Sequence, residues 1–200
     1  IVNGKVSGSS IGDYTKVTTD EGEVLTIKNK KEPLKGVFEV LTTPRGVFLL
    51  KKKGEMALAF LQNSQVGVQL VEGGITLRPV RGSFFIKKSS GSFEVSFPGV
   101  RLISSSISAS VQLIENLDGR YSAHVLSGEA SVISRSGKLD LFAGEGIIFG
   151  KNSELVLSFG CFDRAQLKLK NGVEACRRLS PRQKDIITTT NSALDKYVEF

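Results

Sequence analysis

The stretch GKLDLFAGEGIIFGKNSELVLSF, from Gly137 to Phe159, alternates apolar and polar side chains, pauses at a Gly-Glu-Gly triplet, and then alternates again. Alternation with a period of two is the pattern of a β-strand, because successive side chains point to opposite faces of a sheet. The stretch contains no histidine, no cysteine and no obvious nucleophile. We therefore interpret it as architecture, and expect the function to lie in what the surface of the protein binds.

The same period of two extends over nearly all of residues 21–159. Strand-length segments such as GVFLL, VGVQL and SFEVSF are separated by glycine, Asn-Ser and Pro-Gly turn signals. Short alternating strands at regular spacing are typical of all-β sandwiches, barrels and solenoids. We predict an all-β fold, either short and solenoid-like or a two-sheet β-sandwich, of about a dozen strands.

The two ends of the chain have a different composition. Residues 1–20 are rich in Gly, Ser and Thr and predict a loose N-terminal segment with one strand, ahead of a main domain over residues 21–160. Residues 161–200 predict a C-terminal extension: a hairpin turning on Asn171-Gly172 and a helix with Ser180 as N-cap and Pro181 at its first position. Such a helix would dock on the β domain or lead into a further segment. Its apolar residues can share one face: Ile186, Ile187, Leu194, Tyr197 and Val198.

The composition places the chain among globular proteins. Hydrophobic residues make up 40% and charged residues 24% of the 200 residues. No apolar run approaches the roughly 18 residues that a transmembrane helix needs. Because the sequence opens on Ile1 rather than Met, we expect a processed or trimmed chain, with any membrane anchor outside these residues.

The formal charge of +7 permits an acidic partner. The basic residues form short clusters that are not interleaved with aromatic residues as in nucleic-acid modules, so no specific nucleic-acid partner is expected. These clusters are read either as lysine-rich turns that keep the protein soluble or as a binding face for an acidic partner. The residues of such a face would be Lys51, Lys52, Lys53, Arg78, Arg81, Lys87 and Lys88.

Catalytic chemistry is not predicted. His124, the only histidine, sits in the middle of a predicted strand and is expected to be structural. The serine-rich stretch from Ser104 to Ser110 lacks the Gly-x-Ser-x-Gly context of an activated nucleophile. No spaced cluster of metal ligands occurs, and a Gly-rich phosphate loop is not supported. We expect no enzymatic activity, no cofactor and no metal.

Cys161 and Cys176 are the only cysteines. The predicted hairpin pairs Lys170 with Val173 and therefore sets Cys176 opposite Leu167, which excludes a direct cross-strand disulfide. A bond could still form if the chain before Arg164 bends back. A single disulfide and two free thiols both remain open.

An ordered series of motifs over residues 22–150 resembles the FecR-type domain, the extracytoplasmic domain of bacterial iron-responsive regulators and of many exported proteins. The series runs GEVLTI, LAFLQNSQVGVQL, GGITLRPVRGSFFI, FEVSFPGVRLI, SAHVLSGEASVIS and LDLFAGEGIIFG. One departure is that Ser104 to Ser106 stand where the family usually has a Gly-Thr pair. In this reading the structural turns are at Gly128, Gly144 and Gly146, and LFAGEGIIFG is the closing strand pair.

The resemblance implies a non-enzymatic sensing or scaffolding module outside the cytoplasm of a bacterium, in the periplasm or elsewhere in the envelope. Its partner would be another envelope protein, a transporter or regulator, recognised for instance by strand addition at a sheet edge. The alternative is a β-sandwich that binds a polysaccharide or another polyanion of the cell wall with its basic surface.

Overall fold

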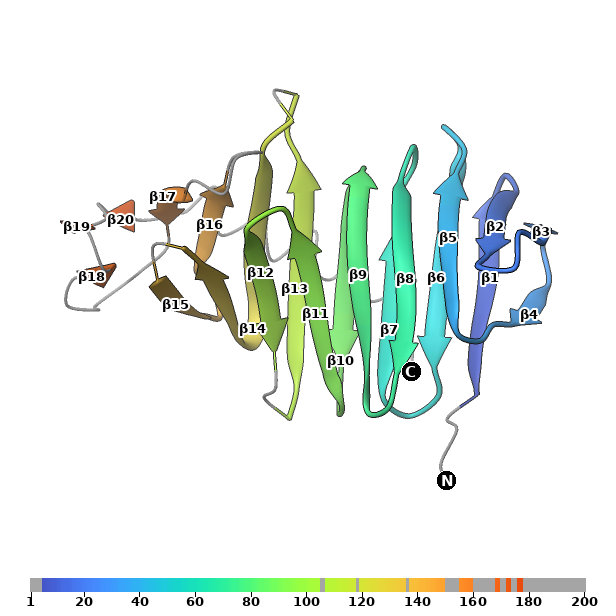
Figure 1. The fold of residues 1–200 in the computed structure, drawn as a ribbon, viewed down its shortest axis with the longest axis horizontal. Coiled ribbons are helices and arrows are strands. Elements are labelled where there is room, and N and C mark those ends of the chain that lie inside the picture. The colour runs from blue at the N-terminus through green and yellow to red at the C-terminus, as the bar shows by residue number, and fades with distance from the viewer. Residues whose placement is uncertain are drawn as a thin grey trace.

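The computed structural model describes residues 5–104, 107–117, 119–135 and 137–149, and the short segments 155–159, 168–169, 172–173 and 176–177. All regular structure in these residues is β (Figure 1). The strands are β1 (Val6–Gly12), β2 (Thr15–Thr19), β3 (Val24–Ile27), β4 (Lys31–Pro33), β5 (Val37–Thr42), β6 (Gly46–Lys52), β7 (Met56–Phe60), β8 (Gln65–Val71), β9 (Gly74–Arg81), β10 (Phe84–Lys88), β11 (Ser92–Phe97), β12 (Val100–Ser104), β13 (Ala109–Glu115), β14 (Tyr121–Ser134), β15 (Gly137–Phe142), β16 (Gly146–Phe149) and β17 (Leu155–Phe159). Three two-residue strands follow: β18 (Lys168–Leu169), β19 (Gly172–Val173) and β20 (Cys176–Arg177).

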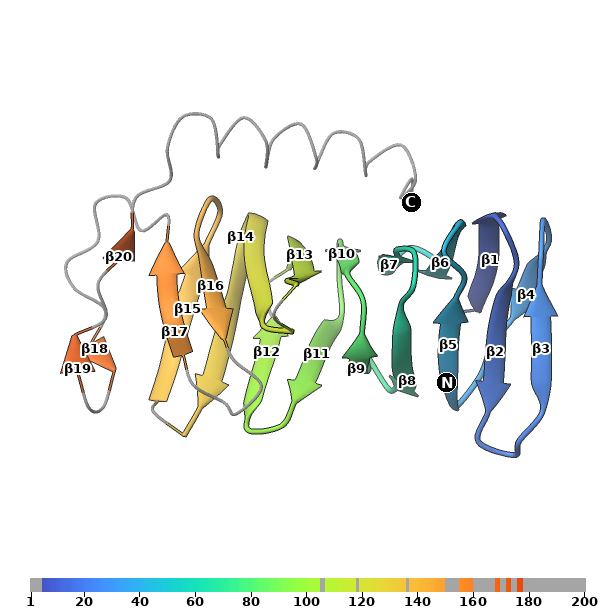
Figure 2. The same cartoon turned by 90° about the horizontal axis from the view of Figure 1, so that it is seen from above.

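The pairings form a nearly closed, barrel-shaped sheet. A path through fourteen strands follows them in the order β4, β1, β6, β7, β10, β13, β14, β12, β11, β9, β8, β5, β2 and β3. Its two end strands, β3 and β4, are consecutive in the chain, and no pairing joins them within the described residues. The barrel is flattened, so that its strands lie in two facing layers (Figure 2). The first layer contains β1, β4, β6, β7, β10, β13 and β16, and the second contains β2, β3, β5, β8, β9, β11, β12 and β15.

The long strand β14 joins the two layers. Its first half pairs with β13 and β16 in the first layer, and its second half pairs with β12 and β15 in the second. The change occurs at Gly128, where the φ angle is 70°, two residues after a bulge at Leu126 that shifts the register against β13 between Ser110 and Val111. Such a bulge bends a strand and increases its local twist. One continuous sheet therefore supplies both layers.

The all-β prediction is confirmed, and the two-sheet sandwich is not. A sandwich would consist of two separate sheets, whereas here β14 pairs within both layers. The solenoid-like alternative does not describe the pairing either, since neighbouring strands are antiparallel except for β11 with β9 and β17 with β20. The alternation in the sequence identifies strands, but it does not say which strands pair.

The expected loose N-terminal segment is also corrected. Strand β1 pairs along its whole length with β6, and β2 pairs with β5. Val6 and Val17 from these strands are buried in the core. The small residue Gly8 is needed in β1 because it lies against the ring of Phe48. A Cβ atom added at Gly8 would come within 2.2 Å of Cζ of Phe48.

A single apolar core fills the space between the layers. Phe48, Phe60 and Phe84 are directly opposite one another on β6, β7 and β10, with ring centroids 6.1 Å apart at both contacts. All three side chains are completely buried. This aromatic row fixes the register of the first layer because a slip of one residue would turn it to the outside.

Candidate functional site: a lysine-lined groove at one end of the barrel

The structure brings five of the seven predicted basic residues to one end of the first layer. Lys51 and Lys87 are opposite Ala57 in one cross-strand row, and Lys52 and Lys88 are opposite Met56 in the next. Lys53 follows in the turn after β6. Since β6 and β10 both run antiparallel to β7, their C-terminal ends lie at the same end of the barrel.

The two predicted arginines lie elsewhere. Arg78 and Arg81 are exposed on β9 of the second layer. Gly74, the first residue of β9, is close to the lysine end, so Arg81 at the last position lies toward the opposite end (Figure 1). The seven residues therefore do not form one continuous face.

Lys52 and Lys88 point toward the interior of the barrel and have structural partners there. Lys52 is 8% exposed, and its Nζ forms an ion pair of 2.7 Å with Oε2 of Glu55. Lys88 is 2% exposed and donates from Nζ to the Gly91 carbonyl at 2.8 Å. Burial lowers the pKa of Lys88 because it disfavours the charged ammonium group.

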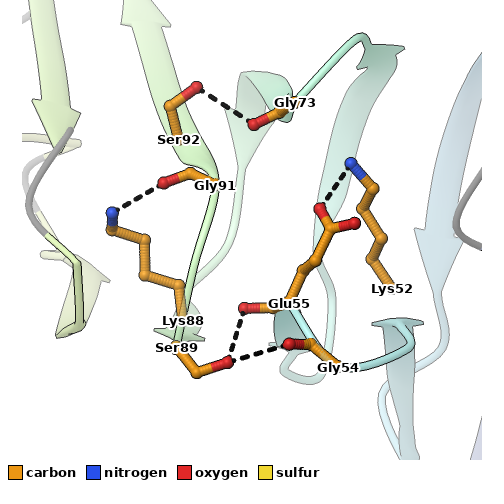
Figure 3. A network of polar contacts seen from close by, with 8 residues as sticks. All are labelled: Lys52, Gly54, Glu55, Gly73, Lys88, Ser89, Gly91 and Ser92. Carbon is orange, nitrogen blue, oxygen red and sulfur yellow. Dashed lines mark hydrogen bonds and ion pairs between the residues drawn. The ribbon is translucent and has the colours of Figure 1, made fainter. Parts of the chain in front are cut away.

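Figure 3 shows how three turns are linked at this end of the barrel. The hydroxyl group of Ser89 donates to the carbonyls of Gly54 at 3.1 Å and Glu55 at 3.3 Å. The hydroxyl group of Ser92 donates to the carbonyl of Gly73 at 3.4 Å. The turns after β6, β8 and β10 are thus held to one another, which gives the lysine end of the barrel a fixed backbone frame.

A groove of about 1310 Å³ opens beside this frame. Its lining combines six lysines and two glutamates with apolar side chains. The lysines are Lys5, Lys31, Lys35, Lys51, Lys52 and Lys53, the glutamates are Glu32 and Glu72, and the apolar residues include Val6, Leu34, Met56, Leu70 and Val71. A mixed cationic and apolar lining suits an acidic ligand that also has an apolar part.

Backbone hydrogen bonds hold the walls of the groove in place. The amide of Leu34 donates to the carbonyl of Val6 at 3.0 Å. The amide of Lys53 donates to the carbonyl of Lys5 at 3.4 Å. On the other side, the amide of Leu70 donates to the carbonyl of Gly36 at 2.9 Å. The groove is consequently formed by segments from four parts of the chain.

Sequence reasoning did not assign Lys5, Lys31 and Lys35 to a site. All three are exposed: Lys5 directly precedes β1, Lys31 is the first residue of β4, and Lys35 follows β4. The signal that could have pointed to them is the cluster of lysines around residue 31. Part of that cluster is neutralised, because Lys30 forms an ion pair with Glu32.

His124 and the described residues of the serine-rich stretch have positions within strands or next to them. His124 lies within β14, as expected, and burial lowers its pKa to about 4. Ser104 and Ser110 are buried, and the hydroxyl group of Ser104 donates to the carbonyl of Glu129 at 2.7 Å. Ser104 therefore supports the sheet near the bend of β14.

The three predicted structural turns have different outcomes. Gly144 lies in the turn between β15 and β16, with a φ angle of 85°. Gly128 is not in a turn but at the bend of β14. Gly146 is a correction, because it is the first residue of β16 and pairs with His124. β15 and β16 extend different halves of β14, so the Gly144 turn carries the chain from one layer to the other.

The C-terminal predictions fall mostly outside the described residues. The pairing of β18 with β19 sets Val173 opposite Lys168, two residues away from the predicted partner Lys170, so Gly172 belongs to the strand rather than to the turn. Cys161 and the predicted helix over residues 181–200 are outside the described part, and of Cys176 only the backbone in β20 is described. The disulfide and the helix stay predictions, as do the domain boundaries.

Within the described residues there is no group of three or more His, Cys, Asp or Glu side chains that could hold a metal ion. Nor does the described part of the chain include a helix of the length and apolarity that crossing a bilayer would take.

Comparison with known proteins gives a weak structural likeness. No family model matches the chain, and no curated protein sequence matches it. Two solved structures of a candidate anti-sigma factor from Parabacteroides distasonis are similar to it. The structure at 2.50 Å resolution has 12% sequence identity and a TM-score of 0.37, and the similarity covers 76% of this chain and 59% of that one.

The structure at 1.65 Å resolution has 13% identity and a TM-score of 0.38, over 75% of this chain and 58% of that one. This chain thus spans less than two thirds of the length of those chains. At these scores the similarity does not define what this chain does.

Proposed function

We propose that this chain is a non-enzymatic recognition module of the bacterial envelope, of the FecR type, and that the lysine-lined groove is where it binds its partner. The observation that carries the proposal is the collection of six lysines against two glutamates, together with apolar side chains, in the lining of one groove. The partner is an acidic segment of another envelope protein. The expected location is the periplasm or another extracytoplasmic site, which follows from the FecR-type motifs between Glu23 and Gly150.

The edge of the sheet beside the groove suits an extended partner. Within the described residues, strand β4 pairs with β1 alone, and its three residues, Lys31, Glu32 and Pro33, line the groove. An unpaired edge can accept a further strand through main-chain hydrogen bonds, with side chains providing specificity. An acidic peptide added along β4 would place its carboxylates near Lys31 and Lys35.

Electrostatic recognition of this kind acts mainly on association and specificity. Surface lysines contribute modest energies individually, but a cluster of one sign attracts an opposite charge over about a Debye length. The predicted complex therefore weakens as salt is added. Lys31, Lys35 and Lys53 are all exposed. We therefore expect these three lysines to make the first contacts with the partner.

The second candidate is an acidic polysaccharide of the cell wall. The same lysines favour it, since they would attract the carboxylates or phosphates of such a polymer. The two candidates differ at the β4 edge, because a polysaccharide has no backbone amides to pair with a strand.

A direct test uses two fluorescent probes of equal charge, a glutamate-rich peptide with alternating valines and an acidic oligosaccharide. Fluorescence anisotropy is measured with the native chain, with a Lys31→Pro variant and with a Lys31→Ala control. The amide of Leu34 donates to the carbonyl of Val6, and the register pairs Glu32 with Gly8, so the amide of Glu32 belongs to the ladder with β1 while the N–H of Lys31 points to the free edge. Peptide binding that Lys31→Pro weakens more than Lys31→Ala supports strand addition. Preferential binding of the oligosaccharide, weakened equally by the two variants, supports the second candidate. Failure of both probes to bind at low salt contradicts the proposed function.

A further inference from the structure

The middle strands of the first layer are buried on both faces. On β7, Met56, Leu58 and Phe60 belong to the core between the layers, while Ala57 and Ala59 belong to a separate apolar cluster. Side chains at successive positions of a strand point to opposite faces. The second cluster therefore lies on the outer face of the first layer, which a half-solvated sheet would give to polar side chains.

This outer face, which we call the outer apolar face, consists of a defined set of residues. Leu49, Ala57, Ala59 and Phe85 are its buried members, and Val47, Leu61 and Leu126 are partly buried around them. Ala59 and Phe85 are both completely buried. Exposed fractions this small do not occur on a free sheet surface, so something covers these side chains.

A row of cross-strand neighbours extends the face across five strands. It runs Leu49, Ala59, Phe85, Gln112 and His124, each directly opposite the next. Gln112 is also buried, with 8% exposure. At about 4.8 Å between neighbouring strands, the row is about 19 Å long.

The sequence contains one segment suited to cover such a row. Residues 181–200 lie outside the described residues, and their apolar side chains recur with helical spacing at Ile186, Ile187, Leu194, Tyr197 and Val198. A helix over these residues would be about 30 Å long, which is enough to cross the row. Its opposite side would carry Thr188 and Ser192, at 100° per residue.

We propose that the outer apolar face is a docking surface whose occupant is this chain's own C-terminal segment, residues 180–200. Leu194 and Ile187 would pack over Ala59, which lies between Leu49 and Phe85, and over Ala57, which lies between Lys51 and Lys87. Small side chains in the sheet let the covering segment approach closely, and the larger ones on either side bound it. The docked segment buries the row as far as His124.

His124 provides a reporter for this contact because it is the only histidine. Its pKa is lowered to about 4 by burial. On the neighbouring strands, Gln112 of β13 and Gly146 of β16 are directly opposite His124, and both are uncharged. A change in the cover of the face will thus show mainly as a change in the solvation of the imidazole.

The experiment compares the full chain with an Ile187→Asp/Leu194→Asp variant, and with Thr188→Asp/Ser192→Asp as a control of equal charge. The His124 resonances are titrated by NMR. Docking predicts that the pKa rises from about 4 toward 6.5 in the first variant and stays low in the control. A pKa that stays near 4 in a folded Ile187→Asp/Leu194→Asp chain would falsify the proposal.

A second measurement covers the case in which that variant does not fold. A photo-crosslinking amino acid replaces Leu194 in the otherwise native full chain, and the products are mapped by mass spectrometry. Intrachain links to β6, β7 or β10 support docking of the C-terminal segment. Links between two chains would assign the face to a second copy and overturn the proposal, as would the absence of any link to these strands.

Discussion

Lys52 and Lys88 face the interior of the barrel on either side of Met56, one on each neighbouring strand. Each ammonium group has a different partner, a carboxylate for Lys52 and a backbone carbonyl for Lys88. Both groups come from clusters that the sequence presents as surface charge. They are instead held by structural contacts at one end of the barrel, beside the groove that contains the exposed lysines.

The ion pair of Lys52 with Glu55 gives a first prediction. Glu55→Gln leaves a buried ammonium group without its counter-charge, and we expect a loss of about 2 kcal/mol in the free energy of unfolding. Glu94→Gln is the matched control, since Glu94 pairs with Arg101 at 3.6 Å on the exposed surface. That change should cost less than about 0.5 kcal/mol. Urea denaturation measures both values, and equal losses in the two variants would show that the buried pair has no special role.

The bend in β14 gives a second prediction. A Cβ atom on Gly128 would meet the Ser108 carbonyl oxygen at 2.1 Å, and the φ angle there is 70°. Gly128→Ala is expected to destabilise the protein by about 3 kcal/mol, because both backbone strain and overlap with a backbone atom must be relieved.

Gly144→Ala is the control for this effect. Gly144 also has a positive φ angle, but no atom lies within 4 Å of an added Cβ. We expect a cost of about 1 kcal/mol from the backbone conformation alone. Thermal unfolding of the two variants should therefore separate clearly, and a Gly128→Ala protein as stable as Gly144→Ala would argue against the tight bend.

The buried imidazole of His124 predicts a pH dependence. Its pKa in the folded protein, about 4, lies below the usual value of 6.5, so the unfolded chain takes up the proton first as the pH falls. The stability due to neutral His124 is present above pH 6.5 and decreases as the pH falls toward 4, by about 3 kcal/mol at pH 4. His124→Gln should remove this part of the pH dependence, while carboxylates titrate alike in both proteins. Identical stability profiles for the two would contradict the buried neutral state.

The alternation in the sequence predicts most of the strands because each must bury one row of side chains. It says less where both faces are buried, as in Met56–Phe60, since a continuous apolar run carries no face information. The topology could not be derived either. That β14 serves both layers depends on a bend at Gly128, and a glycine within an alternating segment is equally compatible with an ordinary turn.

The candidate site could be predicted only in part, and for a related reason. Lys51 to Lys53 were identified as a cluster, but Lys5 and Lys35 approach them only through the pairing of β1 with β4 and β6. Arg78 and Arg81 were grouped with the lysines although they are on the other layer, because charge along a sequence does not reveal which strands are neighbours. The inward direction of Lys52 and Lys88 follows from the alternation of side chains along β6 and β10. Which of the two alternating faces is the inner one depends on the packing of these strands, and the sequence does not show it.

The central claim is that the groove binds an acidic partner through its exposed lysines. The most direct measurement is the affinity of a glutamate-rich peptide for the Lys31→Ala/Lys35→Ala/Lys53→Ala variant, compared with an Arg78→Ala/Arg81→Ala/Lys16→Ala variant of the same net charge. We predict that the first variant binds about tenfold or more weakly and that its affinity depends less on salt, while the second binds like the native chain. Equal weakening in both variants would mean that the attraction is a property of overall charge, and would contradict a site in the groove.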